Sequence, residues 1–254
     1  MREAGGGAQR EVGHDARRRS RTGIRLYACI ALALAWLSGA APLAAQIRGR
    51  PVQRQSSPWW FSGGAAATVL GDIADGATQS RWQFGSDPLW QMRATIEKST
   101  DEFTTIGVAA SYGRVDVTLV PLNDLAIGAP DGVSAGTPGC TTGCAAETEL
   151  YTAMAQFRSG GGPGFHTFFE AQGGVTAFRN LRVKATREAV GTKRMQTDLG
   201  GTLGVGFGYT LSPGFAITLV QDFGMGWHAK ADRPEGTGRT WRVRNTRASL
   251  RFAL

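Results

Sequence analysis

The sequence has 254 residues, of which 42% are hydrophobic and 36 are glycine, and its formal net charge is +8 at pH 7. Residues 1–45 hold seven of the 28 basic and three of the 20 acidic residues, so the rest of the chain carries a net charge of only about +4. A charge this small, with no clustered basic face, argues against a nucleic acid as the partner.

The first 45 residues have the pattern of a cleaved secretory signal peptide. A basic region that ends at Arg25 precedes an apolar stretch from Leu26 to Leu37, and small residues follow as far as Ala45. The apolar stretch is shorter than the roughly 20 residues that a membrane-spanning helix needs, which disfavours the alternative of a retained anchor. We expect export, cleavage after Ala45 and a polar, disordered lead-in over residues 46–57.

Two cysteines, Cys140 and Cys144, remain after the signal peptide has been removed with Cys29. An even pair in an oxidising compartment indicates a disulfide. The alternative, a metal site, lacks a nearby histidine that would complete the ligand set, so we expect a disulfide, no metal and no cofactor. The disulfide either stiffens a loop tip for recognition or protects the loop from proteolysis.

Eight runs of alternating apolar and polar residues follow residue 58, and this period is typical of strands. They cover residues 59–70, 89–98, 103–119, 149–158, 165–178, 196–211, 215–228 and 240–254. The third run changes phase, because Ile106 and Val108 have one parity and Val115 and Val117 the other. This change predicts a β-bulge at Gly113 or Arg114, or a membrane crossing that ends near Tyr112.

The connections between the runs alternate in length, short after the second, fourth and sixth and long after the others. Short turns at one end and long loops at the other are typical of bacterial outer-membrane barrels. The last run ends in "ASLRFAL", which stays apolar on one face to Leu254. We expect it to pair with the first run, because a closed barrel has no free edges.

Residues 58–254 therefore resemble the small eight-stranded outer-membrane β-barrels of the OmpA and OmpW types. The resemblance implies an all-β fold, an eight-stranded antiparallel up-and-down transmembrane β-barrel in the outer membrane of a Gram-negative cell. It also implies recognition by the barrel-assembly machinery, although the terminal aromatic of that family stands here at Phe252 rather than at the last residue.

Strand parity places charges of both signs in the lumen. An eight-stranded barrel is just wide enough for its side chains to fill, so buried charges there should pair. We expect Glu170 to pair with Arg247, Arg93 or Arg251; solvated charges in a wet lumen are the alternative. The predicted lumen charge network is Arg93, Glu97, Glu170, Asp222, Arg247 and Arg251.

The loop after the fifth run is rich in basic residues that could contact the phosphates of lipopolysaccharide, with an ordinary solvated loop as the alternative. The predicted contacts are Arg179, Arg182, Lys184, Arg187, Lys193 and Arg194. The partners we expect are thus outer-membrane lipids and lipopolysaccharide, with an extracellular partner that the sequence does not identify.

A catalytic site is not expected. His228 shares its parity with Asp222, but six residues of strand separate them by about 20 Å, and we expect His228 at the membrane interface beside Trp227. The sequence predicts a non-enzymatic barrel with a charge-plugged lumen and a structural or surface-interaction role through its long loops. A narrow passage for small solutes or apolar molecules, and a lipid-A-modifying enzyme, are the alternatives.

Overall fold

The computed structural model describes residues 59–122, 127, 140, 143–191, 194–228 and 240–254. All of them belong to the unit Gln55–Leu254, the second of two units along the chain. The predicted signal peptide (1–45) and lead-in (46–57), and Lys193, lie outside the described residues. No helix in the described part of the chain is long and apolar enough to cross a membrane.

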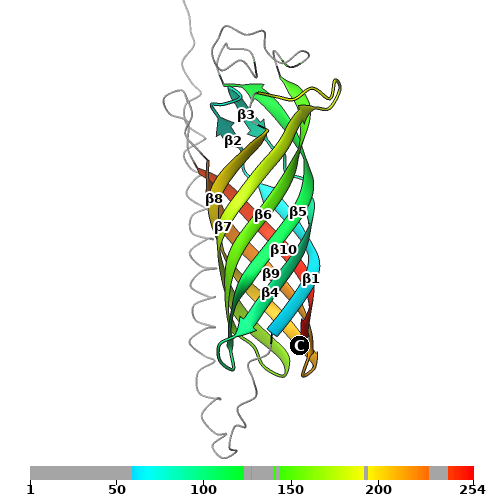
Figure 1. Ribbon diagram of the computed structural model, residues 1–254, viewed down its shortest axis with the longest axis vertical. Coiled ribbons are helices and arrows are strands. Elements are labelled where there is room, and N and C mark those ends of the chain that lie inside the picture. The colour runs from blue at the N-terminus through cyan, green and yellow to red at the C-terminus, as the bar shows by residue number, and fades with distance from the viewer. Residues whose placement is uncertain (1–58, 123–126, 128–139, 141–142, 192–193, 229–239) are drawn as a thin grey trace, which may run out of the picture. The chain divides into compact units, whose positions relative to one another are not determined.

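Eight long antiparallel strands of the described residues form a closed barrel (Figure 1). Their order around the wall is β4-β1-β10-β9-β8-β7-β6-β5, and β5 pairs with both β6 and β4, which closes the ring. The strands are β1 (Trp59–Leu70), β4 (Leu89–Ser99), β5 (Thr104–Pro121), β6 (Cys144–Gly160), β7 (Gly164–Val183), β8 (Met195–Ser212), β9 (Phe215–Trp227) and β10 (Thr240–Ala253). The predicted eight-stranded up-and-down barrel is confirmed.

Closure depends on the pairing of β1 with β10, whose register runs from Trp60↔Ala253 to Leu70↔Val243. The backbone hydrogen bond from the amide of Leu254 to the carbonyl of Trp59 extends the ladder to the last residue, with an N–O distance of 2.9 Å. The "ASLRFAL" segment is therefore the final wall strand, as expected.

The turns and loops separate to opposite ends of the barrel. One end has the short turns, including the one between β6 and β7, where Gly160, Gly161, Gly162 and Gly164 all have positive φ angles that favour glycine. The other end carries the long connections. We call these the turn end and the loop end, and in Figure 1 they lie at the bottom and the top of the barrel.

Two short strands, β2 (Ile73–Asp75) and β3 (Ser80–Gln83), were not predicted from the sequence. They form a hairpin within the first long connection, and β3 pairs with the loop end of β5 from Ser80↔Pro121 to Gln83↔Thr118. This hairpin, which we call the lid, buries Trp82 completely.

The β-bulge predicted at Gly113 or Arg114 is wrong. The pairing of β5 with β6 runs in one unbroken register from Thr104↔Ser159 to Leu119↔Cys144. Odd-numbered residues of β5 face inward along its whole length, so Val115 is buried while Val108 is 59% exposed. The inward-facing residues of β5 are odd-numbered throughout. What changes is the lumen around them, which becomes apolar on the loop-end side of Tyr112.

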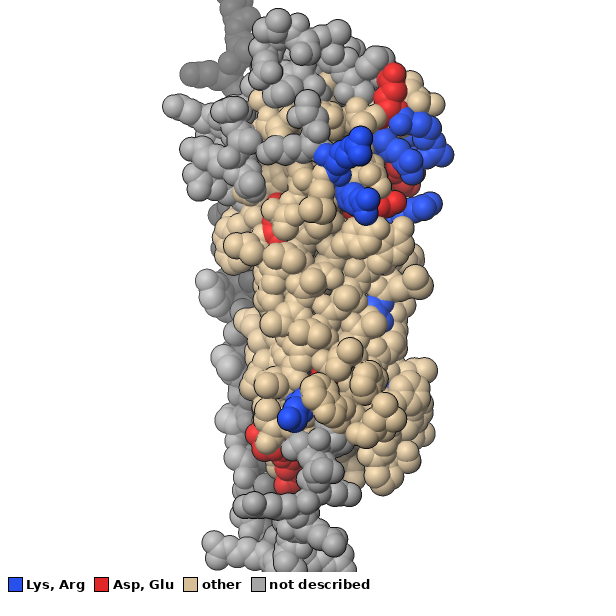
Figure 2. Space-filling model, in the orientation of Figure 1, with Lys and Arg blue, Asp and Glu red and all other residues tan. Residues whose placement is uncertain are grey.

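The wall therefore has two zones. Toward the turn end its outer face is an apolar belt, which Figure 2 shows as a surface with few charged side chains below the charged upper rim, and its inner face is polar. Toward the loop end the outer face carries charges and the interior is an apolar core. The core comprises Leu70, Ile73, Trp82, Phe84, Val115, Val117, Leu119, Ile127, Cys140, Ala146, Leu150, Phe178, Leu181, Val183, Val190 and Trp241.

Candidate functional site: the closed lumen

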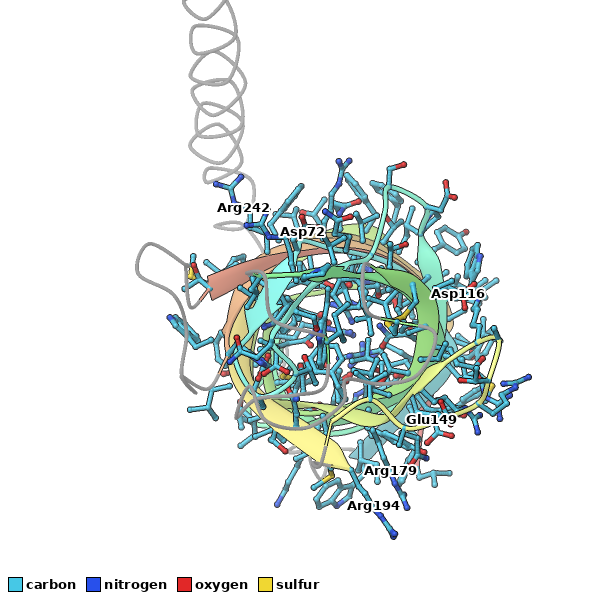
Figure 3. All side chains as sticks on the ribbon, turned by 90° about the horizontal axis from the view of Figure 1, so that it is seen from above. Asp72, Asp116, Glu149, Arg179, Arg194 and Arg242 are labelled. Carbon is cyan, nitrogen blue, oxygen red and sulfur yellow. A yellow bond between two sulfur atoms is a disulfide. The ribbon has the colours of Figure 1, made fainter. Side chains whose placement is uncertain are left out.

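Buried charges of opposite sign fill the lumen in the half near the turn end, and Figure 3 shows the interior packed with side chains. Glu170 on β7 is fully buried and accepts a 2.8 Å hydrogen bond from Nε of Arg158 on β6. It also pairs with Arg247, which reaches across the lumen from β10. One carboxylate thus joins two opposite parts of the wall.

The other two carboxylates of the lumen network, those of Asp222 and Glu97, also bind arginine side chains. Asp222 accepts a hydrogen bond of 2.8 Å from Nη2 of Arg247, and Glu97, also fully buried, accepts one of 2.7 Å from Nη2 of Arg251. Arg158 lies a further 3.6 Å from Glu97. Charged groups inside a barrel wall are costly unless they pair, and here each carboxylate has a guanidinium partner.

Of the three candidate partners of Glu170, Arg247 is the one that it contacts. Glu170 also pairs with Arg158, which the predicted network did not include. Arg251 binds Glu97 instead, and Nη2 of Arg93 donates to the amide oxygens of Gln156 and Gln172 at 2.9 and 3.0 Å. Arg158 and Glu170 are directly opposite across the β6–β7 turn, so the register of that turn was the signal that could have found the pair.

Glycine on β8 makes room for this network. A Cβ atom at Gly204 would collide with the carboxylate of Asp222, which occupies the space above the glycine. In the segment "GVGFG" (residues 204–208) the glycines face the lumen, and their missing side chains leave room for those of neighbouring strands.

A second closure lies at the loop end, where the lid meets the barrel. His228 directly follows β9 and is buried between two carboxylates: Nδ1 lies 2.7 Å from Oδ1 of Asp198 and Nε2 lies 3.1 Å from Oδ1 of Asp75 on the lid. Trp241 donates from Nε1 to Asp198 at 2.7 Å, and Thr78 donates from its backbone amide to Asp75 at 2.9 Å. The expectation that His228 lies at the membrane interface is wrong.

Because both ring nitrogens face carboxylates, the imidazolium form of His228 satisfies the cluster. His228 and Asp75 lie outside the membrane-spanning strands. Burial disfavours the charged ring, but the hydrogen bonds to Asp198 and Asp75 outweigh it and raise the pKa of His228 to about 9. Burial also disfavours the charged form of Asp75 and by itself would raise its pKa. The hydrogen bonds from His228 and Thr78 outweigh burial and lower the pKa of Asp75 to about 2.

The basic residues of the outer rim fall into two groups. Arg182 and Arg187 both pair with Glu147, and Lys184 pairs with Asp116. Arg179 and Arg194 are exposed and form no ion pair with any described residue; both are labelled at the outer edge of the barrel in Figure 3. Three of the six predicted contact residues are thus paired with acidic residues of neighbouring strands, which the composition of the segment alone did not show.

The disulfide joins Cys140 to Cys144, with a Cα–Cα distance of 5.0 Å. Cys144 is the first residue of β6, and Cys140 is fully buried in the apolar core. The bridge therefore lies at the root of the long connection after β5 and not at a loop tip. Among the described residues, no group of three or more His, Cys, Asp or Glu side chains is arranged to hold a metal ion.

A closed eight-stranded wall with an apolar outer belt and a charged interior defines a transmembrane β-barrel of the small outer-membrane type. No protein-family model matches the chain, and no curated protein matches it. Solved structures to which it is similar include Neisserial surface protein A, with 12% identity and a TM-score of 0.44 over 77% of this chain and 97% of that one.

Two further similar structures are Ail, the attachment invasion locus protein of Yersinia pestis, and the outer membrane protease OmpT of Escherichia coli. Ail has 10% identity and a TM-score of 0.39 over 79% of this chain and 100% of that one. OmpT has 8% identity and a TM-score of 0.37 over 79% and 98%. At such identities and scores these likenesses say nothing of what this chain does.

Replacing Glu170 by Gln should strongly destabilise the barrel, because Arg158 and Arg247 would lose a shared buried counter-charge. We expect a loss of about 3–5 kcal/mol in the free energy of unfolding, measured by urea titration of the protein in lipid vesicles with tryptophan fluorescence. Glu149→Gln, on the outer rim, is the control and should cost less than about 1 kcal/mol. A loss below that value for Glu170→Gln would show that the network does not stabilise the barrel.

The His228 cluster predicts a pH-dependent stability. The raised pKa of His228 means that its contribution is fully present below about pH 6.5 and is lost as the pH rises through about 9. The lowered pKa of Asp75 means that its contribution is present above about pH 3.8 and is lost as the pH falls toward 2. The free energies of unfolding of the parent and of His228→Gln, measured as a function of pH, should converge between pH 7 and 10. A constant difference between them across this range would contradict the assignment.

Proposed function

We propose that this chain is a non-enzymatic outer-membrane barrel with a closed lumen, whose rim and extracellular loops carry a structural or surface-interaction role. The observation that carries the proposal is the double closure: the charge network blocks the half near the turn end, and the apolar core with its lid blocks the loop end. The interior is thereby used for stability, and the surface outside the membrane is what remains for interaction.

The apolar belt supports outer-membrane residence, and the proposal includes a cleaved signal peptide over residues 1–45 with a lead-in over residues 46–57. We propose that the barrel-assembly machinery inserts the chain, with β10 as the strand it recognises. Outer-membrane barrels have their short turns in the periplasm, so we place the turn end on the periplasmic side and the lid on the outside of the cell.

The structure gives a lipid-A-modifying enzyme little support. A catalytic histidine must be able to take a proton from a nucleophile that substrate can reach. Both ring nitrogens of His228 are occupied by Asp75 and Asp198, and the cluster is buried beneath the lid. His166, the other described histidine, directs Nδ1 to the backbone carbonyl of Gly164 at 3.1 Å.

We also propose that the outer rim binds phosphate groups of lipopolysaccharide, chiefly through Arg179 and Arg194. Arg179 follows Ala177 by two residues on β7, and Ala177 pairs with Tyr151, which is exposed on the outer face. Exposed aromatic residues mark the level of lipid headgroups, which supports a contact between these two guanidinium groups and lipid phosphates. Arg182, Lys184 and Arg187 are already paired and serve mainly to hold the strands together.

Single-channel recording in a planar bilayer tests the closed lumen. The refolded parent should be silent. Because two closures lie in series, Glu170→Ala with Arg247→Ala should stay largely silent, and Trp82→Ala with Asp75→Ala should as well. Combining all four substitutions should produce channels, provided that heat-modifiable migration on a gel shows a folded barrel. Steady conductance in the parent would instead favour the narrow-passage alternative.

The rim proposal predicts that Arg179→Gln combined with Arg194→Gln weakens lipopolysaccharide binding by roughly tenfold, since charge-assisted hydrogen bonds to phosphate are lost. Binding is measured on the purified protein in detergent by microscale thermophoresis. Arg182→Gln combined with Arg187→Gln is the matched control, and its effect should be smaller because these side chains are held by Glu147. Equal losses in the two double variants would point to net charge alone and contradict a defined site.

A further inference from the structure

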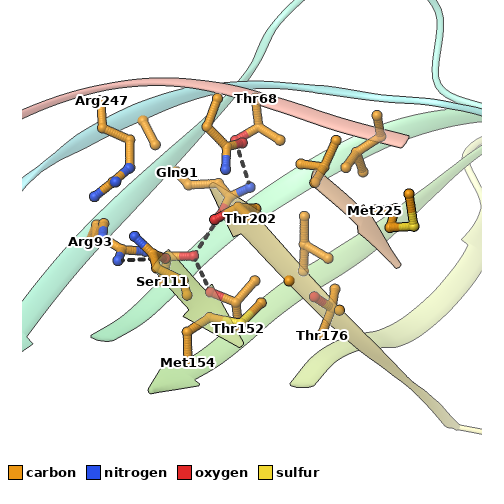
Figure 4. A pocket seen from close by; sticks show the side chains of 18 of the residues that line it. Thr68, Gln91, Arg93, Ser111, Thr152, Met154, Thr176, Thr202, Met225 and Arg247 are labelled. Atoms are coloured by element: carbon orange, nitrogen blue, oxygen red, sulfur yellow. Dashed lines mark hydrogen bonds between the residues drawn. The ribbon is translucent and has the colours of Figure 1, made fainter. Parts of the chain in front are cut away.

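A cavity of about 40 Å³ separates the two closures of the lumen (Figure 4). A buried site needs roughly 10–15 Å³ to hold one water molecule, so this space admits a single ion and a little water. Polar side chains from around the wall line much of it: Thr68, Gln91, Arg93, Ser111, Thr152 and Thr202.

Arg93 is the unusual member of this lining. It shares the lumen with three other arginines that bind carboxylates, but its own hydrogen bonds go to two glutamine oxygens. Within the described residues no carboxylate lies within ion-pair distance of it, and its buried Nε has no hydrogen-bond partner. Neutral amide oxygens leave the charge of the guanidinium uncompensated, which is costly inside a barrel.

The charges of the network do not balance. Four guanidinium groups, from Arg93, Arg158, Arg247 and Arg251, face three carboxylates, from Glu97, Glu170 and Asp222, so one positive charge is in excess. All three carboxylates are already bound by the other arginines. Arg247, whose guanidinium lies on the same side of the cavity as that of Arg93 in Figure 4, adds to the positive potential there.

The acidic cluster at the loop end does not supply the missing charge by contact. Trp241 lines the cavity and donates its indole hydrogen to Asp198, so it covers that carboxylate from the cavity side. With His228 charged, Asp75 and Asp198 leave this cluster one negative charge, which formally matches the excess of the network but is separated from Arg93 by Trp241. The excess charge beside Arg93 therefore faces the cavity itself.

We propose that the cavity binds a small inorganic anion of the size of chloride, with Arg93 as its principal ligand. Nε of Arg93 is a donor that needs an acceptor, and Oγ1 of Thr202, which also lines the cavity and has no partner among the described residues, is free to turn its hydrogen toward the same ion. A bound halide neutralises the excess charge and completes the network. The site is distinct from the rim arginines and does not depend on whether the lumen conducts.

The test uses bromide, whose anomalous X-ray scattering distinguishes it from water. The mature barrel is refolded in sodium bromide, so that the ion enters before the closures form, and is then crystallised from the same salt. We expect an anomalous peak in the cavity next to the guanidinium of Arg93. Arg93→Gln should abolish the peak, whereas Arg244→Gln, on the outer face, should retain it.

A solution measurement accompanies the crystal. The thermal midpoint of the parent should be higher in sodium bromide than in sodium gluconate of equal ionic strength, by about 3 °C at a bromide concentration ten times the dissociation constant. Thr202→Val, which keeps every charge, should reduce this shift, and Arg93→Gln should remove it. If Arg93→Gln fails to fold, the parent's crystal and the Thr202→Val shift decide. A cavity without anomalous density, together with equal midpoints in both salts, would overturn the proposal.

Discussion

The interior of an eight-stranded wall is too narrow to hold solvent-separated ions, and this constraint governs the rest of the structure. Membrane lipid surrounds the wall, so a carboxylate that points inward can find its counter-charge only on another strand. Glu170 has two such counter-charges, Arg158 on the neighbouring strand and Arg247 on a strand across the lumen. The ion pairs Arg247–Glu170 and Arg251–Glu97 therefore connect strands that backbone hydrogen bonds do not join, and they fix the shape of the barrel as well as its charge.

The barrel changes character along its length while its strand parity stays constant. Near the turn end the apolar side chains face lipid and the polar ones face inward. Near the loop end the wall behaves like a water-soluble protein, with Val115 and Trp82 inside and Asp116 outside. The lid follows from this change, because an apolar core that extends beyond the membrane needs a cover, and the hairpin of β2 and β3 supplies it.

Sequence periodicity predicted the wall well, because lipid imposes a two-residue period on every strand and loop length shows which end is which. It left two interpretations open where the surroundings change without a change of conformation: the reversed alternation after Tyr112 predicted either a bulge or the end of the membrane crossing, and the unbroken register excludes the bulge. It also missed the His228 cluster, since Asp75 lies 153 residues away in the chain and reaches the histidine only through the folded lid. Arg158 was missed as a network member because parity gives the face of a residue but not its height or partner.

The two closures use different chemistry and separate sets of residues, and this has a consequence for function. Loss of one ion pair should leave the apolar core in place, and loss of a lid contact should leave the charge network in place, so we expect no single substitution to open a path through the described lumen. In the proposed function the interior therefore acts as a support for the rim, and Arg179 and Arg194 are the rim groups proposed to meet lipid phosphates.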